Sequence, residues 1–179
     1  MVIPKLNSAI ERFTGYVGSI SSDHAYVHKG YAFTAIVNTG SISAAYDIAF
    51  KTPLVANAYV HWRPIGISSS ANYVSFNLYE GDAFTSGSTV TPINRNRNSS
   101  ATSDMQTFVK GATVSPSGTI IQAGGIGTSG TPTARSGGGS AADQELVLKP
   151  NTSYVLTLVP AGATTCILEL FWYEEGYGS

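Results

Sequence analysis

Two histidines four positions apart, His24 and His28, are the residues whose spacing first suggests chemistry. Imidazoles at i and i+4 of a helix can chelate a metal ion, because one helical turn brings them together. The intervening Ala-Tyr-Val favours an extended segment instead. Four residues of extended chain span about 13 Å, too far for two ligands of one ion. The sequence therefore predicts no metal site, and it places His61 as an exposed ring on the polar face of its strand.

Nucleophilic catalysis has little support in the sequence. Serines are numerous, but the chain lacks the Gly-x-Ser-x-Gly pattern that exposes a nucleophile at a strand-to-helix turn. A catalytic triad can be assembled in any chain order on different folds, so this alternative stays open. No serine stands in a recognisable pairing with a histidine and an acid. We therefore expect a protein that is not an enzyme.

Acidic residues occur near one another at two places. Glu80 and Asp82 flank a turn, and Glu169, Glu174 and Glu175 lie in or after the last strand. Paired carboxylates are the machinery of glycoside hydrolysis, which makes a polysaccharide hydrolase one alternative. Charges at turns and strand ends are more commonly solvated, and this is the interpretation we adopt. We expect no catalytic residue, no metal and no cofactor.

Arg95 and Arg97 form the one local basic cluster, within a run of asparagines. Their guanidinium groups can fork onto carboxylates of another subunit, or they can lie in a solvated loop. The glycine-rich stretch further along lacks the Gly-Lys-Ser/Thr ending of a phosphate-binding loop.

The last third of the chain, Glu145 to Glu175, predicts the elements that position these residues. Apolar residues alternate there with a second set, and Pro and Gly interrupt the pattern, which is typical of antiparallel strands with one face in a core. One predicted face holds Cys166, Leu168, Leu170 and Trp172, and the other holds Ile167, Glu169, Phe171 and Tyr173. Phe171 and Tyr173 need cover from the partner sheet's rim, the N-terminal arm or another subunit.

Further strands are expected upstream, and together they predict an all-β fold. The alternation favours strands at residues 32–37, 46–51, 56–63, 73–79, 105–109, 119–122 and 146–148, before the final pair. We predict an antiparallel β-sandwich, jelly-roll-like, spanning residues 31–179. Residues 1–30 are predicted to form an N-terminal arm or a first irregular strand, with a marginal helix between Asn7 or Ser8 and Phe13. Residues 123–143 are expected to form a long glycine-rich loop, which either orders against a partner or stays flexible.

Composition narrows the class of partner. Charged residues make up 12% of the 179 residues and the net charge is −1, which gives no electrostatic footprint for nucleic acid or an anionic membrane. Hydrophobic residues reach 42%, enough for a sizeable core. A surface covered by Ser, Thr, Asn and Gly suits contact with neighbouring subunits, or a soluble domain with polar loops. The single cysteine, Cys166, is expected to be a buried thiol.

Several segments in a fixed order carry a family resemblance. They are Phe-Asn-Leu-Tyr-Glu-Gly at 76–81, Pro-Ile-Asn-Arg-Asn-Arg at 92–97, the turn at 117–119 with the glycine-rich loop, and the closing runs at 145–154 and 171–174. Over residues 26–175 the chain resembles small β-rich virion proteins of tailed bacteriophages, of the head-decoration (cement) kind. The resemblance implies a homo-oligomer, a trimer or else a dimer, that is made in the host cytoplasm and binds the major capsid protein on the outer capsid surface. It offers no active-site residues.

Aromatic and arginine side chains are the usual anchors of protein interfaces. Our candidates for subunit or capsid contact are Tyr16, Tyr26, Tyr31, Arg95, Arg97, Phe171 and Tyr173. A tail or fibre module that binds host glycans, through an exposed aromatic such as Tyr79 or Tyr177, is the alternative function.

Overall fold

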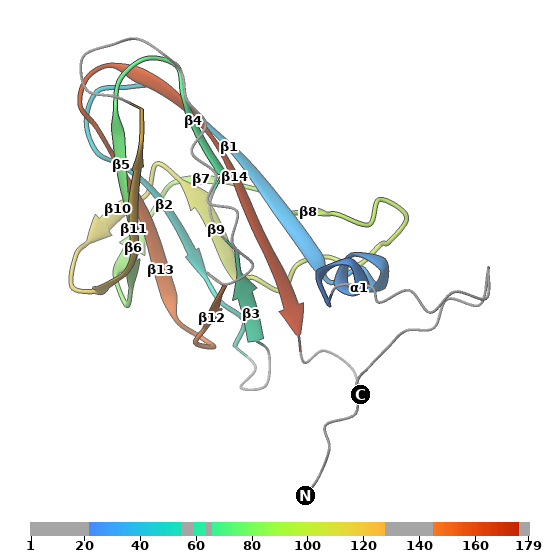
Figure 1. Cartoon of the computed structure of the whole chain (residues 1–179). Coiled ribbons are helices and arrows are strands. Elements are labelled where there is room, and N and C mark those ends of the chain that lie inside the picture. Colours follow the sequence, from blue (N-terminus) through green and yellow to red (C-terminus); the bar gives the residue numbers. More distant parts are fainter. Residues whose placement is uncertain (1–21, 55–58, 64–65, 128–144, 176–179) are drawn as a thin grey trace, which may run out of the picture.

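The computed structural model describes residues 22–54, 59–63, 66–127 and 145–175 (Figure 1). Its elements are α1 (Ser22–Lys29), β1 (Ala32–Ile42), β2 (Tyr46–Lys51), β3 (Tyr59–Trp62), β4 (Gly66–Ser69), β5 (Val74–Glu80), β6 (Ala83–Thr85), β7 (Ser88–Thr89), β8 (Ile93–Asn94), β9 (Thr107–Lys110), β10 (Thr113–Ser115), β11 (Thr119–Ile126), β12 (Leu146–Leu148), β13 (Ser153–Pro160) and β14 (Thr164–Glu175). The expected helix through Phe13, Tyr16 and Tyr177 lie outside the described residues, as do the expected strand's residues 56–58 and most of the glycine-rich loop.

The strands form two antiparallel sheets that pack face to face, so the predicted all-β sandwich is confirmed (Figure 1). The β14 sheet has the order β12-β3-β14-β1-β8, with β4 paired to the other part of β14. The β13 sheet has the order β11-β5-β13-β2-β9-β7, and β6 and β10 form a separate ribbon. Strands β1, β2 and β3 alternate between the two sheets, as do β12, β13 and β14, which is a jelly-roll-like connectivity.

β14 is paired along both edges. β1 runs beside it from Ala32↔Tyr173 to Ile42↔Thr164, with one register shift after Asn38. On its other edge, β3 and β4 pair with successive parts of the strand. This double pairing fixes which β14 side chains face the core and which face outward.

Aromatic rings fill the space between the sheets. Trp62 and Trp172 are fully buried, with ring centroids 6.1 Å apart. Phe50 of the β13 sheet stacks on Trp62 at 4.7 Å, and Phe108 lies 5.7 Å from Trp172. The predicted core face of β14 is confirmed, because Cys166, Leu168 and Leu170 have no exposed surface. Burial also raises the pKa of the Cys166 thiol.

The glycine-rich loop begins later than the sequence predicts. β11 continues to Ile126 and pairs with β5, so residues 123–126 are strand. The glycines are needed there because aromatic rings cover them. A Cβ on Gly124 would lie 2.6 Å from Cζ of Phe76, and one on Gly125 would lie 2.7 Å from Cζ of Tyr73. Glycine in this strand marks close approach of neighbouring side chains and not a loop.

The extended segment expected around His24 and His28 is also wrong, because residues 22–29 form α1. Gly30, with φ of 78°, ends the helix in the left-handed region. The Gly30 N–H bonds to the Val27 carbonyl at 3.0 Å, and the Tyr31 N–H bonds to the Tyr26 carbonyl at 3.0 Å. These two bonds make the Schellman motif, which glycine favours because it lacks a Cβ. Lys29 in the last turn complements the helix dipole.

Three carboxylates that the sequence predicts to be solvated, Glu80, Asp82 and Glu174, make hydrogen bonds within the fold instead. Asp82 is 1% exposed and accepts bonds from the backbone N–H groups of Ser117 and Gly118. Glu80 lies 2.6 Å from Nζ of Lys149 and accepts a bond from the Tyr154 hydroxyl at 3.0 Å. The sequence missed these roles because the partners lie at least 35 residues away.

Glu174 is the third of these carboxylates and is 2% exposed. It accepts bonds from Nε1 of Trp172 at 2.9 Å, from Oγ of Ser103 at 2.6 Å and from the Asp104 N–H at 3.0 Å. Burial raises the pKa of Glu174 above its ordinary value, although these three bonds act to lower it. The carboxylate thus satisfies a buried indole N–H at the cost of its own desolvation.

We predict that Glu174 makes stability fall as the pH rises. Below the unfolded-state pKa, near 4.5, the carboxyl is protonated in both states and folding bears no cost of charge. Between that value and the raised folded-state pKa the folded chain binds more protons, so the free energy of unfolding declines with pH. In urea unfolding at pH 4.5 and 7.5, Glu174→Gln should gain stability relative to the wild type at the higher pH. Parallel pH curves for the two proteins would contradict this role.

Candidate functional site

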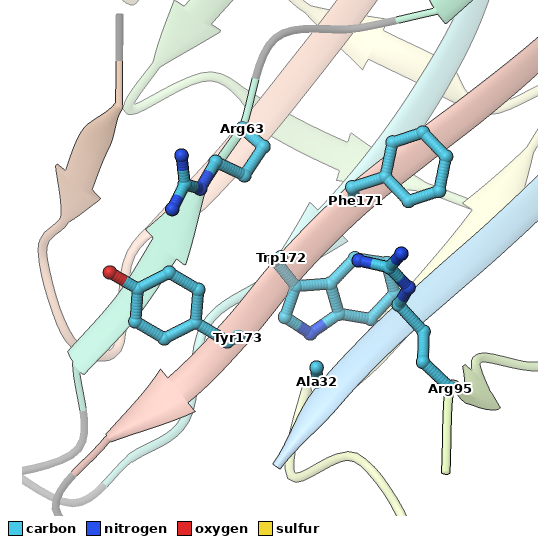
Figure 2. A pocket seen from close by; sticks show the side chains of 6 residues that line it. All are labelled: Ala32, Arg63, Arg95, Phe171, Trp172 and Tyr173. Atoms are coloured by element: carbon cyan, nitrogen blue, oxygen red, sulfur yellow. The ribbon is translucent and has the colours of Figure 1, made fainter. Parts of the chain in front are cut away.

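A hollow opens on the outer face of the β14 sheet, near the end of β14 (Figure 2). Its volume is about 190 Å³, and its lining residues are Ala32, Arg63, Arg95, Phe171, Trp172 and Tyr173. The three aromatic residues are consecutive on β14, and the two arginines approach from its opposite edges (Figure 2). Arg63 follows β3, whereas Arg95 follows β8.

Arg95 is held above the sheet by its backbone. Its N–H donates to the Ala32 carbonyl at 2.9 Å, and its guanidinium carbon lies 5.3 Å from the centre of the Phe171 ring. A guanidinium over an aromatic face is attracted to the ring quadrupole, which orients both groups. Among the described residues, the ion pairs found involve His61, Arg63 and Lys149, and none of them involves Arg95. The Arg95 side chain can therefore still take a carboxylate.

The hollow continues into an exposed apolar strip on the same face. Ile36 of β1 is 56% exposed, Ile167 of β14 is 44% exposed and Ile93 of β8 is 38% exposed. Ile36 lies opposite Glu169 and Ile167 opposite Asn38, so apolar and polar side chains are interleaved. Three isoleucines beside an aromatic hollow form a surface of the kind that partners cover.

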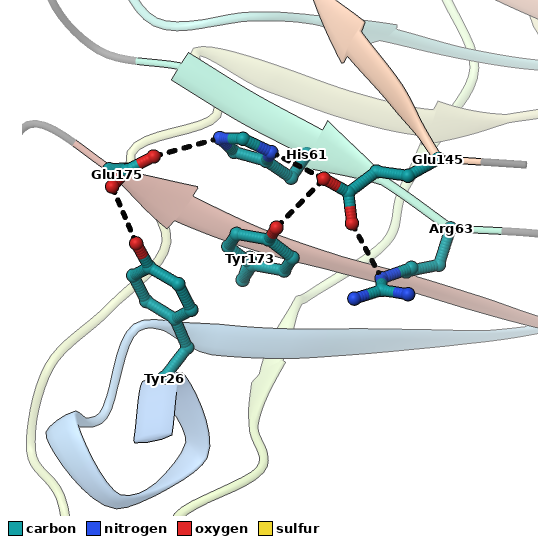
Figure 3. A network of polar contacts seen from close by, with 6 residues as sticks. All are labelled: Tyr26, His61, Arg63, Glu145, Tyr173 and Glu175. Atoms are coloured by element: carbon teal, nitrogen blue, oxygen red, sulfur yellow. Dashed lines mark hydrogen bonds and ion pairs between the residues drawn. The ribbon is translucent and has the colours of Figure 1, made fainter. Parts of the chain in front are cut away.

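α1 covers the Tyr173 end of this face. The Tyr26 ring stacks on the Tyr173 ring with centroids 4.4 Å apart, and its hydroxyl donates to Oε1 of Glu175 at 2.6 Å (Figure 3). The pKa of Tyr26 is raised to about 12, mainly by burial and then by the hydrogen bond to Glu175 and the charges of Glu175 and Glu145. Tyr173 is 8% exposed as a result. The sequence predicts that Tyr173 is covered by the partner sheet's rim, the N-terminal arm or another subunit. In the structure the helix α1 covers it.

His61 lies between two carboxylates and not in solvent (Figure 3). Its Nδ1 is 2.7 Å from Oε1 of Glu145, and its Nε2 is 3.0 Å from Oε2 of Glu175. The ring stacks on Tyr173 at 4.3 Å, and its side chain is 14% exposed. The prediction of an exposed ring is wrong because strand pairing brings Tyr173 beside it and β12 brings Glu145.

Glu145 connects this network to the hollow. Its Oε2 lies 3.0 Å from Nε of Arg63, and its Oε1 accepts a bond from the Tyr173 hydroxyl at 2.8 Å. Burial acts to raise the pKa of Glu145, but the bonds from His61 and Tyr173 and the charge of Arg63 outweigh it and lower the pKa. Arg63 in turn lies over the Tyr173 ring at 5.5 Å. One rigid cluster thus fixes both the helix and one wall of the hollow.

The structure brings together four of the predicted contact residues and places Tyr31 and Arg97 apart from them, while Tyr16 lies outside the described residues. Tyr26, Arg95, Phe171 and Tyr173 share the outer face. Arg97 turns back instead, with Nη1 3.5 Å from the carbonyl oxygen of Asn94. Tyr31 is half-buried and its carbonyl accepts the Glu174 N–H.

Sequence reasoning missed His61, Arg63 and Glu145. Strand alternation put His61 and Arg63 on one face, which is the only signal that they act together. No sequence pattern indicates a role for Glu145, because it precedes a strand of only three residues and its partner His61 is 84 positions away.

Comparisons with protein-family models, curated proteins and solved structures found no match for this chain. Across the part of the chain that the structure describes, no helix has the length and hydropathy to cross a membrane. In that same part, no group of three or more His, Cys, Asp or Glu residues is arranged so that it could hold a metal ion.

We predict that Tyr26 holds α1 in place through its ring and its hydroxyl. Tyr26→Phe should lower the local stability of α1 by about 0.5–1.5 kcal/mol, through loss of the bond to Glu175. Tyr26→Ala should cost more, because the stacking on Tyr173 is worth about a further 0.5–1.5 kcal/mol. Hydrogen exchange at the Tyr31 amide, which bonds to the Tyr26 carbonyl, measures both effects.

Tyr59→Phe provides the matched control. Tyr59 lies opposite Glu175 in register and is 44% exposed, so its hydroxyl should contribute nothing to α1. Equal exchange rates in Tyr26→Ala and Tyr59→Phe would rule out the anchoring role.

Proposed function

We propose that this chain is a non-enzymatic structural protein of a tailed-phage virion, which binds the outside of the assembled capsid as a homo-oligomer and stabilises it. The observation that carries the proposal is the outer face of the β14 sheet, where the Arg95–Phe171 hollow joins the exposed isoleucines. The family resemblance of the sequence supports the same function. A decoration protein needs a rigid body and a face that can lose its water on contact.

The chemistry of the hollow suggests what the capsid would present to it. Arg95 can pair with a carboxylate, and Phe171 together with Ile93 and Ile36 can cover apolar side chains. An acidic residue next to apolar residues on the major capsid protein fits both features. Binding the assembled lattice more tightly than the free capsid subunit would stabilise the shell by mass action.

We predict that Arg95→Ala weakens binding to undecorated capsids by tenfold or more, since a desolvated arginine anchor is worth about 1.4 kcal/mol or more. Arg97→Ala is the control, because Arg97 bonds to its own turn and lies outside the hollow. Co-sedimentation with capsids at low and high salt measures occupancy. Equal binding by the two variants would remove Arg95 from the contact.

The test of the N-terminal arm needs two deletions. Removal of residues 1–21 takes away only residues that precede α1, whereas removal of residues 1–30 also exposes Tyr173. If an arm reaches neighbouring subunits, the shorter deletion should weaken capsid binding and keep the unfolding midpoint. Loss of α1 should in addition lower that midpoint. Unchanged capsid affinity after the shorter deletion would refute the role of the arm. The mass of the truncated protein in solution would show its oligomeric state.

A glycan-binding tail or fibre module is the second candidate, and the hollow is again the reason. An aromatic face flanked by arginines can stack on a sugar ring and pair with a sugar carboxylate. Tyr79 is not the better platform, since it is half-buried and its hydroxyl lies 3.4 Å from Nδ2 of Asn77. Saturable binding of acidic glycans that Phe171→Ala abolishes, without capsid binding, would favour this function over decoration.

A further inference from the structure

The helix α1 places His24 and His28 on one face, one turn apart. Their Nε2 atoms are 2.7 Å apart, while the ring centroids are 4.6 Å apart. The rings therefore converge at their Nε2 corners. The sequence argument against a metal site assumed an extended chain, and the helix removes that assumption.

We propose that His24 and His28 form an exposed two-nitrogen chelate for a divalent transition-metal ion, with Cu(II) or Ni(II) preferred over Zn(II). The site is separate from the hollow and independent of the proposed virion role. Three or more ligands do not converge within the described residues, so water or a neighbouring molecule completes the coordination.

The spacing of the two nitrogens decides the preferred metal. With metal–nitrogen bonds of about 2.05 Å, the right angle of square-planar or octahedral coordination requires nitrogens about 2.9 Å apart. A tetrahedral angle, which Zn(II) prefers in proteins, requires about 3.3 Å. The observed 2.7 Å is closer to the right angle. The intrinsic order of divalent affinities, in which Cu(II) stands highest, acts in the same direction.

The helix is held so that the pair faces outward. At about 100° per residue, Tyr26 lies on the side of the helix opposite His24 and His28. Tyr26 packs on Tyr173, and both histidines are exposed. Nδ2 of Asn96 donates to the His28 carbonyl at 3.0 Å, which anchors the last turn. Little reorganisation is therefore needed when a metal binds, and the metal would join the first turn of α1 to the last.

The test is a titration of the purified, tag-free chain with Cu(II), Ni(II) and Zn(II) chlorides in a non-coordinating buffer, followed by calorimetry. One equivalent of Cu(II) should bind, most tightly of the three ions. His24→Gln and His28→Gln should each weaken Cu(II) binding about tenfold or more, since each removes one of two ligands. Their metal-free unfolding midpoints should match the wild type, because both side chains are exposed.

The matched control keeps the number of histidines and changes their spacing. The double substitution His28→Gln with Lys29→His places the second imidazole at i+5, about 140° from His24 around the helix. Its affinity should fall to that of His28→Gln. Electron paramagnetic resonance of the Cu(II) complex should show two bound imidazole nitrogens in the wild type and one in each single variant. Wild-type affinity in the double variant, or one bound nitrogen in the wild type, would overturn the proposal.

Discussion

The pairing of β14 along both of its edges is the constraint on which the rest of the structure depends. β1 binds one edge, and β3 and β4 bind the other, so the strand cannot rotate or slip without breaking two ladders. Trp172 is thereby fixed in the core and Tyr173 on the outer face. The aromatic stack between the sheets and the cluster outside them both start from these neighbouring residues.

Acidic residues on the two sides of the β14 sheet have opposite pKa shifts. On the inner side Glu174 satisfies the indole of Trp172, and burial keeps its pKa raised. On the outer side, Glu175 contacts Tyr26 and His61, and Glu145 contacts His61 and Tyr173. Burial acts to raise the pKa of Glu145, but its bonds from His61 and Tyr173 and the charge of Arg63 lower it overall. The outer cluster ties α1 to the sheet, which leaves Arg95 and Phe171 at the border between a rigid region and an open apolar strip. A rigid anchor next to exposed apolar surface is a sound basis for docking.

Much of the fold could be predicted from the sequence, because period-two alternation is a local property of a strand. The core face of β14 and the strands around Ile48 and Leu78 follow from it directly. α1 was missed although Gly30 after a basic turn is a helix-end signal, since the β-prone Ala-Tyr-Val inside it suggested extension. The glycines of β11 predict a loop from the local sequence, because the rings of Phe76 and Tyr73 that cover them come from elsewhere in the chain.

The sequence by itself determined which side chains share a face: His61 with Arg63, and Phe171 with Tyr173. Tertiary structure alone decided which faces meet, and so which charges are buried. Tyr26 reaches Glu175 across 149 positions, and His61 reaches Glu145 across 84. No local pattern encodes such pairs, because strand register and sheet order are set by the packing of the whole core. The hollow therefore emerges only in the folded chain, whereas the contact between His24 and His28 depends on the local choice of helix over strand at residues 22–29.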